Sequence, residues 1–289
     1  MTVLQTENLC YTYSPGMPFE HTALHDISIG FEQGELTAII GHTGSGKSTL
    51  VQHLNGLLKP ASGRVLLNGE DIWADSKNIR NIRFRVGMVF QYPEHQLFED
   101  TVEKDIAFGP RNMGLSEEEI DQRVKEAAEF VGLSASLLKK SPFDLSGGEK
   151  RRTAIAGVMA MRPEVLILDE PTAGLDPHGR DLILEQIDRY RRENGTTVLL
   201  VSHSMEDVAR IADKVLVMQH SRVAMYDTAP RVFDRAAELE EMGLSVPAVT
   251  RIFSQLADKG IADHDAVYTL EQAEQAAVAL LKEKGVTVC

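Results

Sequence analysis

One eight-residue segment constrains the fold of this chain more than any other. Residues 41–48 read Gly-His-Thr-Gly-Ser-Gly-Lys-Ser, which fits the pattern G-x-x-x-x-G-K-[ST]. An apolar run of strand length, residues 36–40, precedes the segment, and helical spacing follows it over residues 48–58. A strand, a glycine-rich loop and a helix in this order predict the first βαβ unit of a buried parallel sheet, with the loop at the sheet's edge.

The loop has the composition of a phosphate-binding site. Glycines let its backbone curl so that successive N–H groups face an anion, and the N-terminus of the following helix adds its dipole. Lys47 supplies a charge for the β- and γ-phosphates of a nucleotide, and the Ser48 hydroxyl is a ligand for Mg²⁺. The alternative, a chance glycine-rich turn, matches the four fixed positions in about one per cent of chains of this length. The residues expected to bind the nucleotide are Gly41, His42, Thr43, Gly44, Ser45, Gly46, Lys47, Ser48 and Thr49.

Two later apolar runs end in polar residues that fit the same site. Residues 165–168 are followed by Asp169 and Glu170, and residues 196–201 by a serine and His203. Runs this apolar predict buried parallel strands whose carboxyl ends meet at one edge of the sheet. Two adjacent carboxylates there repel each other and lose hydration, a cost that a metal ion offsets. We expect Asp169 to hold Mg²⁺ and Glu170 to polarise the water that attacks the γ-phosphate, the alternative being the solvated start of a loop.

Three other side chains carry weaker signals for the same nucleotide. His203 is placed to contact the γ-phosphate and the catalytic carboxylate, although a strand-end histidine is more often structural. Gln91, which follows the apolar residues 86–90, offers a ligand to Mg²⁺ or to the water. Tyr13 is expected to stack on an adenine, and its neighbour Tyr11 competes for that role. The expected catalytic residues are Lys47, Gln91, Glu170 and His203, and the expected Mg²⁺ ligands are Ser48, Gln91 and Asp169.

A second segment has the features of an anion site. Residues 145–149, Leu-Ser-Gly-Gly-Glu, stand before Lys150 and two arginines and open an alanine-rich helical stretch. A serine and two glycines at a helix N-terminus present N–H groups to an anion, although they also make an ordinary N-cap. Because the chain has one phosphate-binding loop and this separate helix start, we expect Ser146, Gly147 and Gly148 to serve the nucleotide of another subunit.

The regions around these motifs predict short strands and an inserted helical part. Residues 3–5 and 27–31 read as strands on either side of a turn at residues 14–16. The insertion at residues 93–161 is mainly helical, and its clearest helix starts with a Ser-x-x-Glu capping box at residue 116. Five apolar residues on one face of that helix are expected in the core: Ile120, Val124, Ala127, Ala128 and Val131.

The end of the chain has a different composition, rich in alanine, glutamate and leucine after about residue 230. We expect two helices there, of which the first covers residues 247–258. The second is capped by Thr269 with Gln272 and closed by Gly285. These helices predict a small C-terminal appendage.

Composition excludes several functional classes. The chain has 289 residues and 43% hydrophobic content, enough for about two domains with a packed core. Its 30 basic and 43 acidic residues give a net charge of −13 without a basic cluster, which argues against binding nucleic acid or anionic lipid by charge. The sequence lacks an apolar run of about 20 residues and a signal peptide, so we expect a cytoplasmic chain. Cys10 and Cys289 have no partners at metal or disulfide spacing and are expected as reduced thiols.

The order of these motifs resembles that of an ABC transporter ATPase subunit over residues 3–225. The glycine-rich loop, Gln91, the 145–149 signature, the paired carboxylates, the Ala-Gly-Leu-Asp segment at residues 173–176 and His203 all match in sequence order. The resemblance implies an α/β fold of the P-loop NTPase type, with a mixed sheet and an inserted helical subdomain, and a small helical C-terminal extension. The implied domains are an ABC ATPase domain over residues 1–229, with its helical subdomain at about 93–161, and the extension at 230–289.

The same resemblance implies how the residues act. Lys47, Ser48 and Asp169 bind phosphate and Mg²⁺, Glu170 is the general base, Gln91 senses the nucleotide and His203 is the γ-phosphate switch. Two subunits of such a family pair head to tail, so that Ser146, Gly147 and Gly148 close over ATP held by the partner, with Asp176 at the dimer seam. The implied reaction is ATP hydrolysis to ADP and phosphate.

Further segments resemble the energy-coupling factor importers, and within them the second of the two paired ATPases, the A-prime subunit. The matching segments are residues 41–44, 53–57, 90–94, 96–98, 108–110, 151–152, 244–247 and 259–260. The resemblance implies three partners: a sister ATPase, a transmembrane coupling subunit that docks near residues 91–98, and a small membrane protein that captures a vitamin or metal ion. It places the chain at the cytoplasmic face of the cell membrane as a peripheral subunit.

The fifth residue of the signature departs from the family pattern, because Glu149 stands where glutamine is usual. A carboxylate near a triphosphate weakens an anion site, so the activity of the site that this signature completes stays open. Two alternatives also stay open: the homodimeric ATPase of a cobalt or nickel importer, and a soluble ABC switch that acts outside transport. The second is disfavoured by the single phosphate-binding loop and the absence of sustained heptads.

Overall fold

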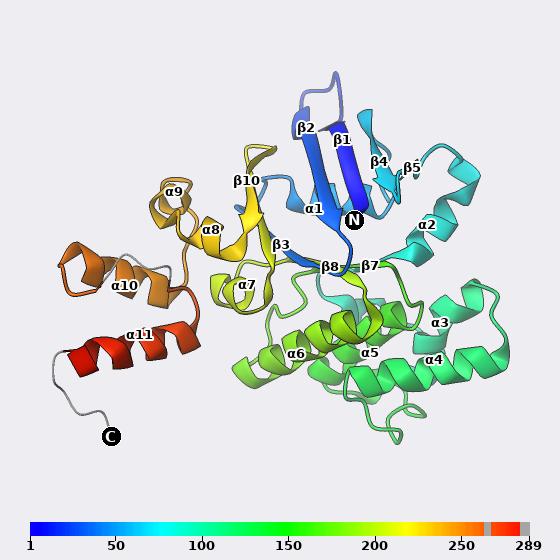
Figure 1. The fold of residues 1–289 in the computed structure, drawn as a ribbon. Coiled ribbons are helices and arrows are strands. Elements are labelled where there is room, and N and C mark those ends of the chain that lie inside the picture. Colours follow the sequence, from blue (N-terminus) through cyan, green and yellow to red (C-terminus); the bar gives the residue numbers. More distant parts are fainter. Residues whose placement is uncertain (263–266, 284–289) are drawn as a thin grey trace.

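A six-stranded sheet forms the centre of the computed structural model, which describes residues 1–262 and 267–283 (Figure 1). Its strand order is β10-β9-β3-β8-β7-β6. The strands are β3 (Leu36–Gly41), β6 (Val86–Val89), β7 (Val165–Asp169), β8 (Thr197–Val201), β9 (Lys214–Gln219) and β10 (Arg222–Thr228). All neighbouring pairs are parallel except β9 with β10, and every residue of β3, β7 and β8 is buried. The prediction of buried parallel strands from three apolar runs is therefore confirmed.

A second, antiparallel sheet has the order β2-β1-β4-β5. Its strands are β1 (Thr2–Tyr13), β2 (His21–Glu32), β4 (Ser62–Leu67) and β5 (Glu70–Asp71). The prediction of short strands at residues 3–5 and 27–31 was wrong in extent, because both belong to twelve-residue strands of one hairpin. Residues of positive φ, Asn8 (47°) and Asp26 (55°), mark irregular points that break the period-two pattern. The predicted turn is present at the hairpin tip, where Met17 N donates to Ser14 O at 3.0 Å.

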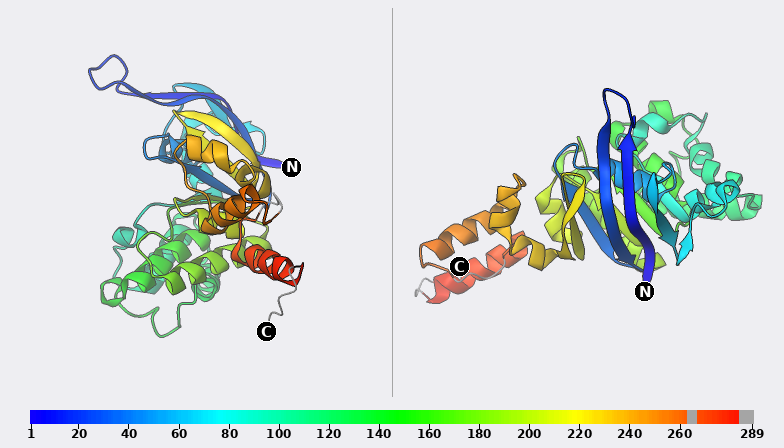
Figure 2. Two further views of the ribbon diagram at one scale, coloured as in Figure 1. Left: turned by 90° about the vertical axis from the view of Figure 1, so that its left-hand side faces the viewer. Right: turned by 90° about the horizontal axis from the view of Figure 1, so that it is seen from above.

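The helices lie in three groups (Figure 1). Next to the antiparallel sheet are α1 (Lys47–Leu54), η1 (Ser76–Asn78) and α2 (Ile79–Arg85). The insertion contains η2 (Pro93–Gln96), α3 (Val102–Asn112), α4 (Glu117–Phe130), η3 (Pro142–Asp144) and α5 (Gly147–Met159), which confirms its helical character, and α6 (Pro177–Asn194) packs beside it. The remaining helices are α7 (Met205–Ile211), α8 (Ala229–Phe233), α9 (Ala236–Glu241), α10 (Ala248–Asp258) and α11 (Leu270–Glu283). Figure 2 shows α10 and α11 on the side of the molecule opposite the insertion.

Helix ends differ from their predictions for identifiable reasons. The helix after the phosphate-binding loop ends at Leu54 and not at residue 58, because Asn55 is its C-cap and Gly56 has a φ of 70°. The capping box expected at Ser116 is only half formed: Ser116 accepts from the backbone of Glu119, whose carboxylate bonds Arg123 instead. The structure places α8 and α9 ahead of the two helices expected after residue 230.

The C-terminal helices agree with their predicted starts. Pro247 is the N-cap of α10. Thr269 and Gln272 form a reciprocal cap, because the Gln272 amide oxygen accepts from Thr269 N and the Thr269 hydroxyl accepts from Gln272 N, both at 3.2 Å. The predicted closure at Gly285, and the predicted free thiol at Cys289, lie outside the described residues, whereas Cys10 is free.

Separate apolar clusters hold the layers together. One joins a face of the central sheet to the inserted helices and α6, and it contains all five residues of the predicted stripe on α4. A second lies between the two sheets and includes Leu50 and Leu54 of α1. A third covers β3 and β9 with α7, α8 and α9. Within residues 1–262 and 267–283, no helix combines the length and the apolar character needed to cross a membrane.

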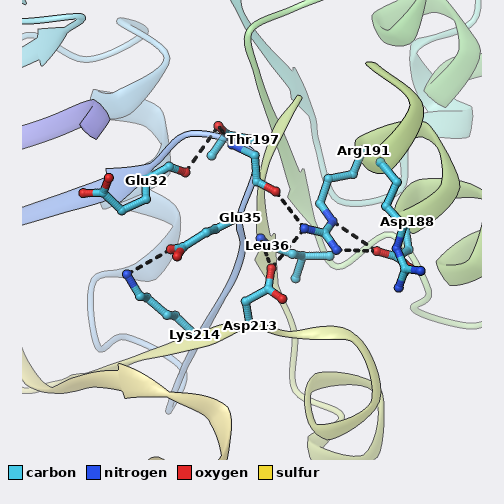
Figure 3. A network of polar contacts seen from close by, with 10 residues as sticks. Glu32, Glu35, Leu36, Asp188, Arg191, Thr197, Asp213 and Lys214 are labelled. Carbon is cyan, nitrogen blue, oxygen red and sulfur yellow. Dashed lines mark hydrogen bonds and ion pairs between the residues drawn. The ribbon is translucent and has the colours of Figure 1, made fainter. Parts of the chain in front are cut away.

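A polar network holds the start of β3 (Figure 3). Asp213 accepts from the backbone N–H of Leu36 at 2.8 Å and from Arg191 at 3.1 Å. The Arg191 guanidinium also donates to Gly34 O at 2.7 Å and to Asp188 at 2.8 Å. Because Leu36 is fully buried, its N–H depends on this carboxylate as its partner. The network therefore sets where β3 begins, and so where its loop emerges at the other end.

We expect Asp213→Ala to lower the free energy of unfolding by about 1–3 kcal/mol, because it leaves a buried N–H without an acceptor. Asp213→Asn keeps an acceptor oxygen and should cost less. Urea unfolding followed by circular dichroism measures both variants. An alanine variant as stable as the wild type would contradict the role of this carboxylate.

Candidate functional site

A cavity of about 300 Å³ opens at the edge of the central sheet where β3, β6, β7 and β8 end. It is lined by Tyr13, His21, Ala23, Thr43, Gly44, Gly46, Lys47, Ser48, Thr49, Gln91, Glu170 and His203. The sequence motifs predict all of these residues at the site except His21 and Ala23. His21 and Ala23 lie on β2, and only the pairing of β2 with β1, which sets His21 opposite Tyr13, brings them here.

The glycines of the loop have backbone angles that other residues rarely adopt. The φ angles are 149° at Gly41, 80° at Gly44 and 104° at Gly46. A Cβ at Gly41 would overlap the carbonyl oxygen of Met218, and one at Gly46 would overlap that of Ala23. The first and third glycines are therefore required by close packing as well as by φ.

Lys47 is held by the backbone of its own loop. Its Nζ donates to Gly41 O at 2.6 Å and to His42 O at 2.9 Å, and the residue is only 6% exposed. Burial lowers the pKa of the Lys47 ammonium, while the nearby Glu170 and Asp169 carboxylates act in the opposite direction. The loop thus presents a buried cation at the cavity wall, suited to the oxygens of a phosphate.

Asp169, the last residue of β7, is a buried carboxylate beside the loop. Burial raises its pKa, the charge of Glu170 raises it further, and a hydrogen bond from Ser48 acts to lower it. Because burial makes the negative charge of Asp169 unfavourable, a cation bound beside it would stabilise the charged carboxylate. Because hydroxyl and carboxylate oxygens are the ligands that Mg²⁺ prefers, Ser48 and Asp169 fit this ion together with nucleotide phosphates. No group of three or more His, Cys, Asp or Glu side chains with metal-binding geometry occurs among the described residues.

Glu170 lies between the two polar residues expected beside it. His203 Nε2 is 3.0 Å from Glu170 Oε1, and Gln91 Nε2 donates to Glu170 Oε2 at 2.9 Å. Glu170 has a φ of 52°, and its backbone N–H donates to Val201 O of β8 at 3.0 Å. Gln91 and His203, which follow β6 and β8, therefore meet the carboxylate of Glu170, which follows β7, and each contacts one of its two oxygens.

The two tyrosines that compete for the adenine are neighbours, with 4.9 Å between ring centroids, but they lie in different surroundings. Tyr13 lines the cavity, and its hydroxyl is 3.3 Å from the Thr49 hydroxyl. Tyr11 packs against the core between the sheets and meets the ring of the buried His53 edge-on, with 4.6 Å between centroids. Of the two rings, the one that lines the cavity is therefore that of Tyr13.

Other predicted residues, Gly41 and Asp169 among them, lie outside the cavity lining. The ring of His42 bonds to the carbonyl of Met242 at 2.8 Å, and the Ser45 hydroxyl is buried without a hydrogen-bond partner. Ser146 caps α5, and Glu149 accepts from Ser146 N at 2.8 Å and from Ser146 Oγ at 2.7 Å, which completes a capping box. Hydrogen bonds from Ser146 lower the pKa of the Glu149 carboxyl. The chain therefore does not bring its signature segment to its own cavity.

We expect Asp169→Asn to raise the melting temperature of the ligand-free protein at pH 7. The raised pKa means that the buried anion costs stability above that pKa and that the cost disappears as pH falls and the carboxyl is protonated. The difference in melting temperature between the variant and the wild type should therefore shrink toward pH 4. The variant should also lose its binding of Mg²⁺-nucleotide. Scanning calorimetry and nucleotide titration measure the two effects.

Asp207→Asn is the matched control, because burial also raises the pKa of Asp207, whose carboxylate accepts from Thr172 and not from Ser48 of the phosphate-binding loop. It should keep nucleotide binding. An Asp169→Asn protein that binds Mg²⁺-nucleotide as the wild type does would contradict the assigned role of Asp169.

The comparisons with known proteins agree with this geometry. The family model described as "ABC transporter" matches residues 24–173. A protein of Clostridium acetobutylicum named energy-coupling factor transporter ATP-binding protein EcfA2 is 55% identical, over 96% of this chain and 98% of the relative. A Clostridium perfringens protein of the same name is 53% identical, over 98% and 99%.

Solved structures show the same fold. The structure of cbiO1 from Clostridium perfringens, part of the ABC transporter complex cbiONQ, has a TM-score of 0.75 and 40% identity, covering 88% of this chain and 99% of that one. A dimeric ATP-binding cassette in a post-hydrolysis state with ADP and phosphate has a TM-score of 0.71 and 26% identity, covering 78% and 98%. The predicted P-loop NTPase fold of the ABC type is confirmed.

Proposed function

This chain belongs to the ABC transporter family of ATP-binding proteins, and we propose that it is the ATP-hydrolysing A-prime subunit of an energy-coupling factor importer. The observation that carries the proposal is the constellation at the sheet edge: a buried lysine in a glycine-rich loop beside a carboxylate held by a glutamine and a histidine. Relatives with the same name over nearly the whole length support the assignment.

The site residues divide the work of hydrolysis. Loop N–H groups and Lys47 bind the phosphates, and Tyr13 offers a ring to the base. A Glu170 oxygen takes the proton of the water whose oxygen bonds to the γ-phosphorus as ADP leaves. His203 and Gln91 hold the Glu170 carboxylate in position for that transfer. Most of the rate increase would come from this positioning together with charge stabilisation.

Mg²⁺ belongs to this site as a resident ion. Ser48 and Asp169 would hold it, with Gln91 as a third oxygen ligand. When bound, it supplies positive charge to the phosphate oxygens. Its charge would also offset the cost of burying the Asp169 carboxylate.

A second ATPase subunit would complete the nucleotide site. Ser146, Gly147 and Gly148 open α5 away from the cavity of their own chain, which supports a role at a partner's nucleotide. The likeness to a dimeric cassette supports the same arrangement, with Asp176 at the seam. Because the relatives are named as EcfA2, a sister ATPase is the preferred partner.

The membrane partners would dock on the face next to Gln91. Residues Phe98 (59% exposed) and Phe108 (46% exposed) meet edge-on at 4.9 Å between centroids beside the Gln91 segment. Such an apolar surface suits a helix of a transmembrane coupling subunit. A small membrane protein would then select the vitamin or metal ion, and this chain would act peripherally at the cytoplasmic face of the membrane.

One observation favours the alternative of a homodimeric ATPase in a cobalt or nickel importer. The cbiO1 structure, 40% identical, is part of a cbiONQ complex. Partners recovered from gently solubilised native membranes separate the two assignments. A second ATPase supports the energy-coupling factor assignment, self-copies with one metal-importer assembly support the alternative, and cytosolic partners alone would overturn transport and favour the soluble switch.

We expect Glu170→Gln to lower ATP hydrolysis by at least about 100-fold, because it removes the base, while ATP still binds. The measurement is phosphate release by the purified transporter complex, with ATP binding measured in parallel. The matched control is Glu193→Gln, at an exposed glutamate of α6, which should hydrolyse normally. Hydrolysis by Glu170→Gln at the wild-type rate would show that another group is the base.

We expect Glu149→Gln to hydrolyse ATP as fast as the wild type or faster. Glutamine keeps an oxygen for Ser146 N–H and removes the negative charge from a helix start that faces a nucleotide in the proposed dimer. Steady-state hydrolysis by the complex measures this, with Glu149→Ala as the comparison that also removes the cap. A large loss in the glutamine variant would show that the carboxylate has a positive role.

A further inference from the structure

The phosphate-binding loop makes a side-chain contact with a distant part of the chain. The His42 ring donates from Nε2 to the backbone carbonyl of Met242, with 2.8 Å between nitrogen and oxygen. Met242 is the C-cap of α9, so its carbonyl is among the helix-end acceptors that have no partner inside the helix. A residue that the motif places at the nucleotide thus uses its ring to bind the C-terminal extension.

The helix that carries the acceptor packs against the core of the ATPase part of the chain. Leu239 is fully buried and Leu244 is 9% exposed, and both belong to the cluster that contains Ala38 and Ile40 of β3. Leu244 N donates to Leu239 O at 2.8 Å, which closes the turn after α9. The end of α9 is therefore packed on the same strand that leads into the phosphate-binding loop.

The turn after α9 is shaped to the ring. Gly243 has a φ of 74°, and a Cβ built there would lie 2.8 Å from His42 Nε2 and 3.3 Å from Cε1. A separation below 3.0 Å forces a shift, so a side chain at this position would push the ring away. Glycine is needed here both for the backbone angle and for the approach of the histidine.

His42, whose ring bonds Met242, also supplies a backbone acceptor for Lys47. The His42 carbonyl accepts from Lys47 Nζ at 2.9 Å and from Ser45 N at 3.1 Å. A shift of His42 would therefore move one of the two acceptors that hold the lysine, together with the backbone that faces the phosphates.

We propose that His42 is a positioning residue through which the end of α9 holds the phosphate-binding loop in its binding conformation, so that the C-terminal extension sets nucleotide affinity. The proposal rests on the proposed function, because it takes the loop to bind a nucleotide. The ring acts through the backbone of the loop and through Lys47.

The first test is the affinity of the full chain for Mg²⁺-ADP, measured by calorimetric titration. Loss of one hydrogen bond predicts that His42→Ala weakens binding about threefold to tenfold. His42→Gln keeps an N–H of similar reach and should retain most of the affinity. The proposal is overturned if His42→Ala binds Mg²⁺-ADP as tightly as the wild type.

The second test is a double-mutant cycle between His42→Ala and Gly243→Ala. In the wild-type background the added Cβ displaces the ring and should weaken binding by a factor similar to that of His42→Ala. In the His42→Ala background the Cβ meets no ring, and the further loss should be under about twofold. Equal fold losses in both backgrounds would overturn the proposal.

Gly260→Ala is the matched control in the same extension. Gly260 has a φ of 65°, similar to that of Gly243, but a Cβ there meets nothing within 4 Å. It shares the backbone strain without the contact, so it should lower stability and leave nucleotide affinity unchanged. If the wild-type chain does not bind nucleotide, the proposed function fails; if it binds and all variants bind equally, only the inference about His42 fails.

Discussion

Complete burial of β3 is the constraint on which the site depends. The strand lies between β8 and β9, and all six of its residues are buried, so it has one position in the sheet. Its last residue, Gly41, passes so close to the Met218 carbonyl that no Cβ fits. The loop that follows therefore leaves the sheet in one direction. Because β6, β7 and β8 run parallel to β3, their final residues meet the loop at the same edge.

This arrangement explains which parts of the fold could be predicted. A strand buried on both faces is an uninterrupted apolar run, so β3, β7 and β8 are readable from residue types alone. The hairpin of β1 and β2 is not, because positive φ angles at Asn8 and Asp26 shift the alternation that marks a half-buried strand. The capping box at Ser116 fails for a different reason, since Arg123 competes for the Glu119 carboxylate.

The functional site, like the fold, could be predicted from the sequence only in part. The rule that parallel strands end at one edge brings Gln91, Glu170 and His203 together in advance of any coordinates. This rule does not predict which hydrogen bonds these residues form. It also does not predict that His21 lines the cavity, which depends on the register of the β1–β2 hairpin. The His42 ring bonds the carbonyl of Met242, 200 positions away in the sequence, and a local sequence pattern cannot predict a contact over that separation. The sequence therefore predicts which side chains lie at this edge of the sheet, whereas the packing of distant segments determines which hydrogen bonds they form.

Two buried groups of the site have charges whose cost a single ligand can offset. Burial lowers the pKa of Lys47 and raises that of Asp169, so each group is disfavoured in its charged form. The buried sheet tolerates these costs because its apolar packing does not depend on them. A phosphate chain with a divalent cation supplies the opposite charge to both groups at once. Of the two groups, Lys47 donates to the backbone carbonyl of His42, whose ring bonds the end of α9, so the buried cation and the C-terminal extension share one residue of the loop.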